Sequence, residues 1–457
     1  MAGIGFELRR LSHSQTYFGL LRAYAYAGIV SSGPWVLSIA AILMLGMLSI
    51  GLVIPSVQIT RFQVSVTWLI ALSLVYTGGF QLIYTRYVAD RLFERRPEFV
   101  VPNLTGAMLV LLLPASALVS IAMLVWFPGT SAAYRLLMIL GFVLLCMVWV
   151  LTVLLSGLKQ FRAVLLIYFL GYGSVLVVAL WWRPYGMEGL LGGFVAGQLV
   201  LVLGMARLIW KEYPPVRLVD LDFFRHQRTR LWLIPAGILF NAAVWVDKFI
   251  FWLSPATGDR VIGVLYSSVI YDTPTFLAYL TIVPGMAVFL FRMEVDFVRA
   301  YDRYFTLVRS GGTLAAIEEQ RRAMVISARH GIRDILGTQG LTLLVLIAFA
   351  RTLLPALGIS VLYSGQLAII SVGVMLQLLV MAALNILFYL DDLRETVAIT
   401  AVMLVANAAC SWASIALGPY FYGYGFASGM LIAVVVALPL VNRRLARLNY
   451  ETFMHTR

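Results

Sequence analysis

The chain has 457 residues, of which 61% are hydrophobic and 12% are charged, whereas an ordinary soluble domain carries about 25% charged residues. These values, with a formal net charge of +13, exclude a soluble globular protein. Apolar runs of about 20 residues recur along the whole chain, and only helices or closed barrels satisfy the backbone in lipid. The sequence therefore predicts an all-α, polytopic membrane protein.

The apolar segments number about twelve. They cover residues 19–48, 64–86, 104–127, 134–157, 162–182, 187–210, 231–253, 261–291, 338–355, 361–389, 395–417 and 419–441. If the N-terminus is cytoplasmic, 28 of the 34 basic residues fall in segments on the cytoplasmic side. This asymmetry follows the positive-inside rule, so we expect both termini in the cytoplasm and attribute the basic charge to topology rather than to nucleic-acid binding.

Two long polar segments divide the chain. The first, 211–230, separates six spans from six, and the second is 292–337. This pattern predicts an N-terminal six-helix lobe over 1–210, a cytoplasmic linker over 211–230, and a C-terminal six-helix lobe over 231–457 with a cytoplasmic amphipathic segment at 292–337. Several transporters join two helical bundles in this way around a central site.

The first span carries its own helix breaker near mid-depth, in the stretch "SSGPW". Pro34 removes a backbone donor and Gly33 lets the chain bend, so we predict a hinge there; a kink that serves packing alone is the alternative. Tyr24 and Tyr26 lie in the same span and are candidates to line a substrate path, because an aromatic face with a hydroxyl suits a sugar. Core packing is the other interpretation of these two rings.

The seventh span contains "FNAAVWVDKFIFW", with two charges at lipid depth. Asn241, Trp245 and Lys248 share one helical face, and Asp247 lies beside Lys248. Intramembrane charge costs about 2.5–3.5 kcal/mol on insertion scales, so such residues face a partner or a cavity. Three interpretations remain open: a structural ion pair with Lys248, a water-filled lumen lined by these groups, or a misplaced span edge.

The eighth span contains "YDTPTFLAYLTIVPG". Asp272 lies two residues before Pro274, where we expect an unwound turn that acts as a hinge and exposes the carboxylate. Tyr279 lies seven residues after Asp272 and therefore on the same helical face. We predict that Asp272 and Tyr279 line the substrate path.

The segment 313–335 within the second polar stretch has apolar residues at helical spacing. It predicts an amphipathic helix at the inner membrane surface, with Arg321 and Arg322 on its polar side. We expect these two arginines to dock a cytoplasmic enzyme; anchoring to lipid alone is the alternative.

Catalytic motifs are missing from the sequence. No lysine follows a glycine as a P-loop requires, and the four histidines have no ligand spacing. Cys146 and Cys410 both lie inside apolar spans, which is typical of buried small hydrophobes. We therefore expect no enzyme activity, no cofactor and no metal site.

Several long stretches together resemble one known family. They are "MAGIGFELRR", "LLRAYAYAG", "SSGPWVLS", "VWVDKFIFW" and "YDTPTFLAYLTIVPGMAVFLFRMEVDF", and the likeness runs from Met1 through the last span. The chain resembles the PelG family, inner-membrane transporters of the Pel exopolysaccharide system. The resemblance implies the fold of the multidrug/oligosaccharidyl-lipid/polysaccharide flippase superfamily, with two six-helix lobes around a central cavity.

The same resemblance implies a function and partners. The expected function is export, through that cavity, of a growing amino-sugar polymer for the biofilm matrix across the bacterial inner membrane. The expected partners are a cytoplasmic PelF-like glycosyltransferase that makes the polymer, and PelD-like and PelE-like membrane proteins, PelD being a cyclic-di-GMP receptor. Two rival functions stay open: a cation-coupled small-molecule antiporter of the same fold, and a non-transporting membrane scaffold for a cytoplasmic synthase.

Overall fold

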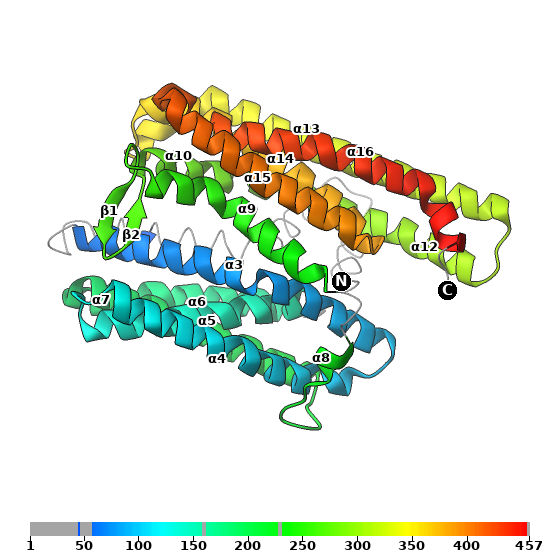
Figure 1. Cartoon of the computed structure of the whole chain (residues 1–457), viewed down its shortest axis with the longest axis horizontal. Coiled ribbons are helices and arrows are strands. Elements are labelled where there is room, and N and C mark those ends of the chain that lie inside the picture. The colour runs from blue at the N-terminus through cyan, green and yellow to red at the C-terminus, as the bar shows by residue number, and fades with distance from the viewer. Residues whose placement is uncertain (1–43, 46–56, 158–160, 227–230, 455–457) are drawn as a thin grey trace. The chain divides into compact units, whose positions relative to one another are not determined.

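The structure is a computed structural model that describes residues 44–45, 57–157, 161–226 and 231–454. Helices dominate these residues (Figure 1), as the sequence predicts. Ten helical segments among them are long and apolar enough to cross a membrane, and two of the ten, Ala163–Glu212 and Val269–Arg309, each contain more than one α-helix. The chain is therefore a multi-pass membrane protein; the exact number of spans and the side of the termini stay predictions.

The described residues form two compact units. The N-terminal unit lies within Gly33–Trp245 and Trp252–Ser268, and the C-terminal unit lies within Val246–Phe251 and Val269–Arg457. Helix α9, Leu233–Leu253, contributes residues to both units.

The N-terminal unit is built mainly from five long helices. Its elements are α3 (Val57–Phe93), η1 (Pro97–Phe99), α4 (Val100–Trp126), α5 (Ala132–Gly157), α6 (Phe161–Trp182), η2 (Arg183–Tyr185), α7 (Gly186–Glu212), the short α8 (Asp222–His226), and the hairpin of β1 (Asp259–Ile262) and β2 (Leu265–Ser267). Part of the predicted linker 211–230 packs on this unit, because the buried Phe223 ring of α8 contacts Tyr84 and Tyr87 of α3.

The C-terminal unit contains the remaining helices. They are α10 (Val269–Leu280), α11 (Ile282–Phe291), the π-helical turn η4 (Arg292–Phe297), α12 (Val298–Arg309), α13 (Leu314–Ala356), η5 (Val361–Tyr363), α14 (Ser364–Tyr389), α15 (Leu393–Leu417), η6 (Pro419–Phe421) and α16 (Tyr424–Met454). Helices α14 and α15 both pack against α16 (Figure 1).

The start of the predicted span 261–291 is wrong. Residues 259–267 form the antiparallel hairpin β1–β2, in which Arg260 pairs with Tyr266 across a turn at Gly263. The side chain of Trp68 on α3 donates a hydrogen bond of 2.8 Å to the backbone oxygen of Tyr266. The hydropathy of this stretch comes from β-branched and aromatic residues, which suit a strand as well as a helix.

Residues 313–335 do not form a separate helix. They are the first half of α13, which runs unbroken from Leu314 to Ala356, and the Thr313 hydroxyl caps its start by accepting from the amide of Ala316. The apolar face of this half, including Met324 and Ile335, is buried inside the C-terminal unit. The structure therefore differs from the expected surface-lying helix, because tertiary packing covers the apolar face.

Close helix contacts rest on small residues four positions apart. On α16, Gly425 and Gly429 face α15, and a Cβ added at Gly429 would lie only 2.6 Å from the Cα of Asn407. On α7, Gly193 and Gly197 face α6 in the same way. Such pairs let helices approach closely in lipid, where packing replaces the hydrophobic effect as the force that joins them.

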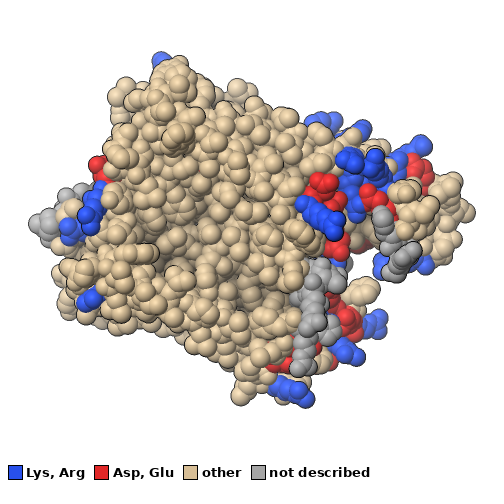
Figure 2. Space-filling model, viewed as in Figure 1, with Lys and Arg blue, Asp and Glu red and all other residues tan. Residues whose placement is uncertain are grey.

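Charge is sparse on much of the surface that Figure 2 shows. Figure 2 shows a broad uncharged surface, and in the C-terminal unit the charged side chains of this view gather where α12 and the first half of α13 lie beside the end of α16. The exposed surface of α4 illustrates the uncharged part, with Leu113, Ile121 and Leu124 all more than half exposed. An apolar exterior of this kind matches a lipid environment.

Candidate functional site

The most unusual polar feature of the described residues is an ion pair buried in the C-terminal unit. Asp247 is 0% exposed and Lys248 is 6% exposed. The Nζ of Lys248 lies 3.1 Å from Oδ2 and 3.2 Å from Oδ1 of Asp247. Adjacent residues on a helix point about 100° apart, so the long lysine stem bends back to reach its neighbour.

Two neutral side chains from other helices also bind the carboxylate. The hydroxyl of Tyr271 on α10 donates to Oδ2 of Asp247 at 2.7 Å, and Nδ2 of Asn407 on α15 donates to Oδ1 at 3.3 Å. The Ser411 hydroxyl donates to Oδ1 of Asn407 at 3.1 Å, which fixes the amide with its NH₂ group toward Asp247. The close approach of α16 at Gly429 holds Asn407 in place.

Aromatic rings enclose the ammonium group. The Nζ of Lys248 lies 4.9 Å from the ring centroid of Tyr279 and 5.5 Å from that of Phe426. The Tyr279 hydroxyl donates to Oε1 of Gln377 on α14 at 2.7 Å. Phe251 stacks on Tyr271 with centroids 3.8 Å apart. The cation is thus held by a carboxylate and by ring faces, and these interactions strengthen when water is excluded.

We call Asp247, Lys248, Tyr271, Tyr279 and Asn407 the Asp247 cluster. Its members and their contacts come from α9, α10, α14, α15 and α16, so the cluster joins five helices. Its groups neutralise one another, and the arrangement offers no activated nucleophile. Among the described residues no three His, Cys, Asp or Glu side chains are placed to hold a metal ion. The cluster is suited to fixing helices against one another.

Two other predicted residues of the seventh span make contacts within the N-terminal unit. Asn241 and Trp245 are half-buried and belong to the N-terminal unit, where Asn241 donates to the oxygen of Gly237 at 3.0 Å and Trp245 packs on Trp252 at 6.2 Å. The predicted face of Asn241, Trp245 and Lys248 is therefore divided between the two units.

Asp272 is half-buried in the first turn of α10, next to Tyr271 of the cluster. Helix α10 continues through Pro274, so the turn expected there is absent. The break lies at Thr281, between α10 and α11, where Nε2 of Gln339 donates to the Thr281 oxygen at 2.9 Å. Pro274 is the sixth residue of α10, so its missing N–H removes one bond of the helix, to the carbonyl of residue 270, without ending the helix.

Four of the predicted residues, Tyr24, Tyr26, Gly33 and Pro34, lie outside the described residues. The lumen and hinge roles assigned to them stay predictions.

The two predicted docking arginines differ in their surroundings. Arg321 donates to both carboxylate oxygens of Glu318, at 2.8 and 2.7 Å, and to the backbone oxygen of Leu445 on α16 at 3.0 Å. The Arg322 side chain is 73% exposed and reaches Glu318 at 3.3 Å. Both lie in the polar first half of α13, outside its apolar stretch, and hydrogen bonds from Arg321 lower the pKa of Glu318 to about 2. Arg321 therefore joins α13 to α16, whereas Arg322 presents its charge to the surface.

Sequence reasoning missed one buried acid altogether. Glu294, in the π-helical turn η4, is 6% exposed and accepts from the Tyr389 hydroxyl at 2.7 Å and from Nδ2 of Asn385 at 3.3 Å. The charge of the segment 292–337 predicts a cytoplasmic location, where an acidic residue such as Glu294 is ordinary. The available signal was its apolar setting between Met293 and Val295, both of which are buried.

The fold is that of a known class of membrane transporters. A MOP superfamily transporter from Pyrococcus furiosus matches with a TM-score of 0.66 and 16% identity, over 93% of this chain and 96% of its own. An outward-facing MATE family transporter matches with a TM-score of 0.62 and 15% identity, over 93% of this chain and 96% of its own. An inward-facing MATE family transporter matches with a TM-score of 0.60 and 15% identity, over 90% of this chain and 99% of its own. The chain thus has a MATE-like transporter fold.

The family model named PelG, "Putative exopolysaccharide Exporter (EPS-E)", matches residues 1–453, and the chain belongs to this family. No curated protein matches the sequence of this chain.

Proposed function

We propose that this protein exports a growing Pel-type amino-sugar exopolysaccharide across the bacterial inner membrane. One observation carries the proposal: the exporter-family match covers residues 1–453, and transporter structures of the same fold align with 93% of the chain. Transporters of this fold have been solved facing outward and facing inward. Alternating access by this chain is consistent with that pair of states.

In this mechanism the Asp247 cluster keeps part of the C-terminal unit rigid. It connects helices from α9 to α16 through charge-assisted and neutral hydrogen bonds, including the 2.7 Å bond from Tyr271. A buried pair with all its partners in place resists separation, because a bare charge would remain in a low-dielectric interior. The cluster thereby lets these helices move together during transport.

The rival antiporter needs an intramembrane acid that gains and loses a proton. Asp247 is poorly suited to that task, because Lys248, Tyr271 and Asn407 all donate to it. Asp272 is a second acid of this region, half-buried in the first turn of α10. We propose that Asp272 contacts the substrate path. The polymer-export and antiporter hypotheses both require such a path, whereas the scaffold hypothesis has none.

The polymer must come from another protein, since the chain shows no catalytic motif of a glycosyltransferase. We propose that a PelF-like cytoplasmic glycosyltransferase supplies it, and that PelD-like and PelE-like membrane proteins complete the assembly.

Complementation of a deletion strain tests the function. We expect the wild-type gene to restore secretion of a hexosamine-rich polymer, measured by sugar analysis of the medium. Asp272→Asn should lower secretion without lowering membrane abundance, whereas Glu98→Gln, at an exposed site in η1, should act like wild type. Unchanged secretion by the deletion strain would refute the export function, and wild-type secretion by Asp272→Asn would remove Asp272 from the path.

A further inference from the structure

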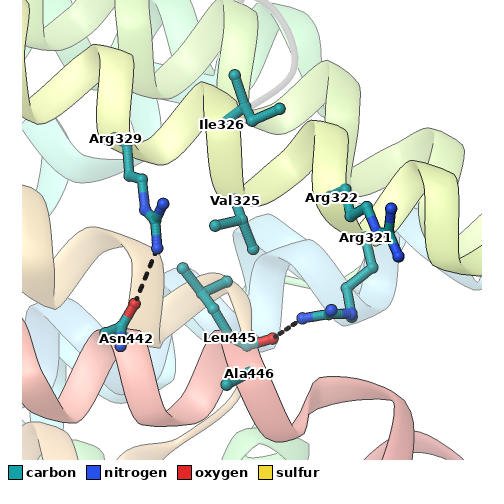
Figure 3. A pocket seen from close by; sticks show the side chains of 8 residues that line it. All are labelled: Arg321, Arg322, Val325, Ile326, Arg329, Asn442, Leu445 and Ala446. Atoms are coloured by element: carbon teal, nitrogen blue, oxygen red, sulfur yellow. Dashed lines mark hydrogen bonds between the residues drawn. The ribbon is translucent and has the colours of Figure 1, made fainter.

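A basic groove lies between α13 and α16 in the C-terminal unit. It has a volume of about 290 Å³, and Figure 3 shows its lining, which consists of Arg321, Arg322, Val325, Ile326, Arg329, Asn442, Leu445 and Ala446. Arg321 and Arg329 reach from α13 to α16 on either side of Val325 and Leu445 (Figure 3). The groove therefore combines an apolar centre with a cationic margin.

The arginines of the groove are not equally engaged. Arg321 is held by Glu318 and by the Leu445 oxygen. Arg322 is 73% exposed in its side chain, and Arg329 is exposed with one long bond of 3.4 Å to Oδ1 of Asn442. A guanidinium carries five N–H donors, so Arg322 and Arg329 keep most of theirs for an incoming anion.

The depth of the groove indicates what the anion is. The apolar run of α16 ends at Val441, and the groove residues Asn442–Ala446 follow at once. At 1.5 Å per residue they lie about 2–8 Å beyond that run. The polar headgroup layer of a bilayer is about 5–8 Å thick on each side. Two bonds place the α13 side of the groove against the same part of α16: Arg329 donates to Asn442 at one end, and Arg321 donates to the Leu445 oxygen at the other.

We propose that this groove binds the headgroup of an anionic phospholipid. Arg322 and Arg329 contact the phosphate, and Ile326, which is 51% exposed, packs with Val325 against the first methylenes of the acyl chains. A volume of 290 Å³ suits a headgroup but not a partner helix, whose diameter is about 10–12 Å. In the orientation that the positive-inside distribution predicts, the groove lies on the cytoplasmic side, where anionic lipid attracts basic residues.

The direct test measures binding of phosphatidylglycerol to the purified full chain. The variant is Arg322→Gln with Arg329→Gln, and the matched control is Arg303→Gln with Arg309→Gln, which removes the same charge from exposed sites on α12. A hydrogen bond to a charged group contributes about a factor of ten or more, so the groove variant, which loses two such contacts, should bind about 100-fold more weakly. Arg303 and Arg309 have no such contact in the proposal, so the control should change less than threefold. Size-exclusion chromatography confirms that both variants stay folded.

A second variant separates a lipid from a free phosphate. Ile326→Ser should weaken binding of phosphatidylglycerol while leaving binding of inorganic phosphate unchanged, because only the lipid contacts the apolar part. Wild-type affinity in the groove variant, or an equal loss in the α12 control, would overturn the proposal. So would unchanged lipid binding together with lower co-purification of the glycosyltransferase, since that result would assign the groove to the docking role first expected for Arg321 and Arg322.

Discussion

Replacing Lys248 with Met tests whether the Asp247 cluster is dry. The change keeps the length of the apolar stem and removes only the charge, which leaves a buried Asp247 carboxylate with its two neutral donors at 2.7 and 3.3 Å. Removing one partner of a buried ion pair costs about 3–5 kcal/mol, whereas a hydrated pair contributes about 0.2–1 kcal/mol. Since Asp247 is 0% exposed, we expect the larger loss.

The assay is a denaturant titration of the purified protein in detergent, which measures the free energy of unfolding of each variant. The double variant Asp247→Asn with Lys248→Met should regain most of the lost free energy, because the Asn oxygen still accepts from Tyr271 and no charge remains. Exchanging the two charges should likewise restore more export than either single change. As a control, Arg86→Met removes a partner of the half-exposed pair with Asp90 and should cost less than about 1 kcal/mol. A loss below about 1 kcal/mol for Lys248→Met would show that water reaches the pair, and the lumen interpretation would then replace the structural one.

Three further predictions concern other parts of the C-terminal unit. The pKa of Glu318 is about 2, below its usual 4.5. The stability that its ionised carboxylate contributes should therefore be fully present above pH 4.5 and be lost as the pH falls toward 2. The melting temperature of Glu318→Gln should lack this part of the acid dependence. Glu294→Ala should lower the free energy of unfolding by about 1–3 kcal/mol, since two half-buried donors lose their acceptor, while Glu294→Gln should cost less; equal losses would contradict these bonds. Gly429→Val should destabilise the protein by at least about 1–3 kcal/mol, because the new Cβ would clash with Asn407. Gly337→Ala should not destabilise it, because no atom lies within 4 Å of a Cβ added there. Thermal melting of both variants tests this difference.

The sequence alone was sufficient for the class of protein and for most span positions. Hydropathy is a local and additive property, so the predicted spans 104–127 and 134–157 end within one residue of α4 and α5 and begin within four residues of them. The hydropathy-based prediction was wrong at 261–267, where apolar β-branched residues form a hairpin rather than a helix. The predicted surface helix at 313–335 was also wrong, because tertiary contacts cover its apolar face. Asp247 and Lys248 stood out because charges are rare at lipid depth.

Only the tertiary structure decided which groups meet. Tyr271 and Asn407 are 24 and 160 residues from Asp247, and the approach of Asn407 depends on Gly429 of yet another helix. The roles of Arg321 and Arg322 diverge for the same reason: one reaches a backbone oxygen on α16, 124 residues away, and the other does not. Local pattern specifies where a helix forms and which face is apolar, but partners are set by helix packing, which depends on small residues and side-chain shapes distant in the chain.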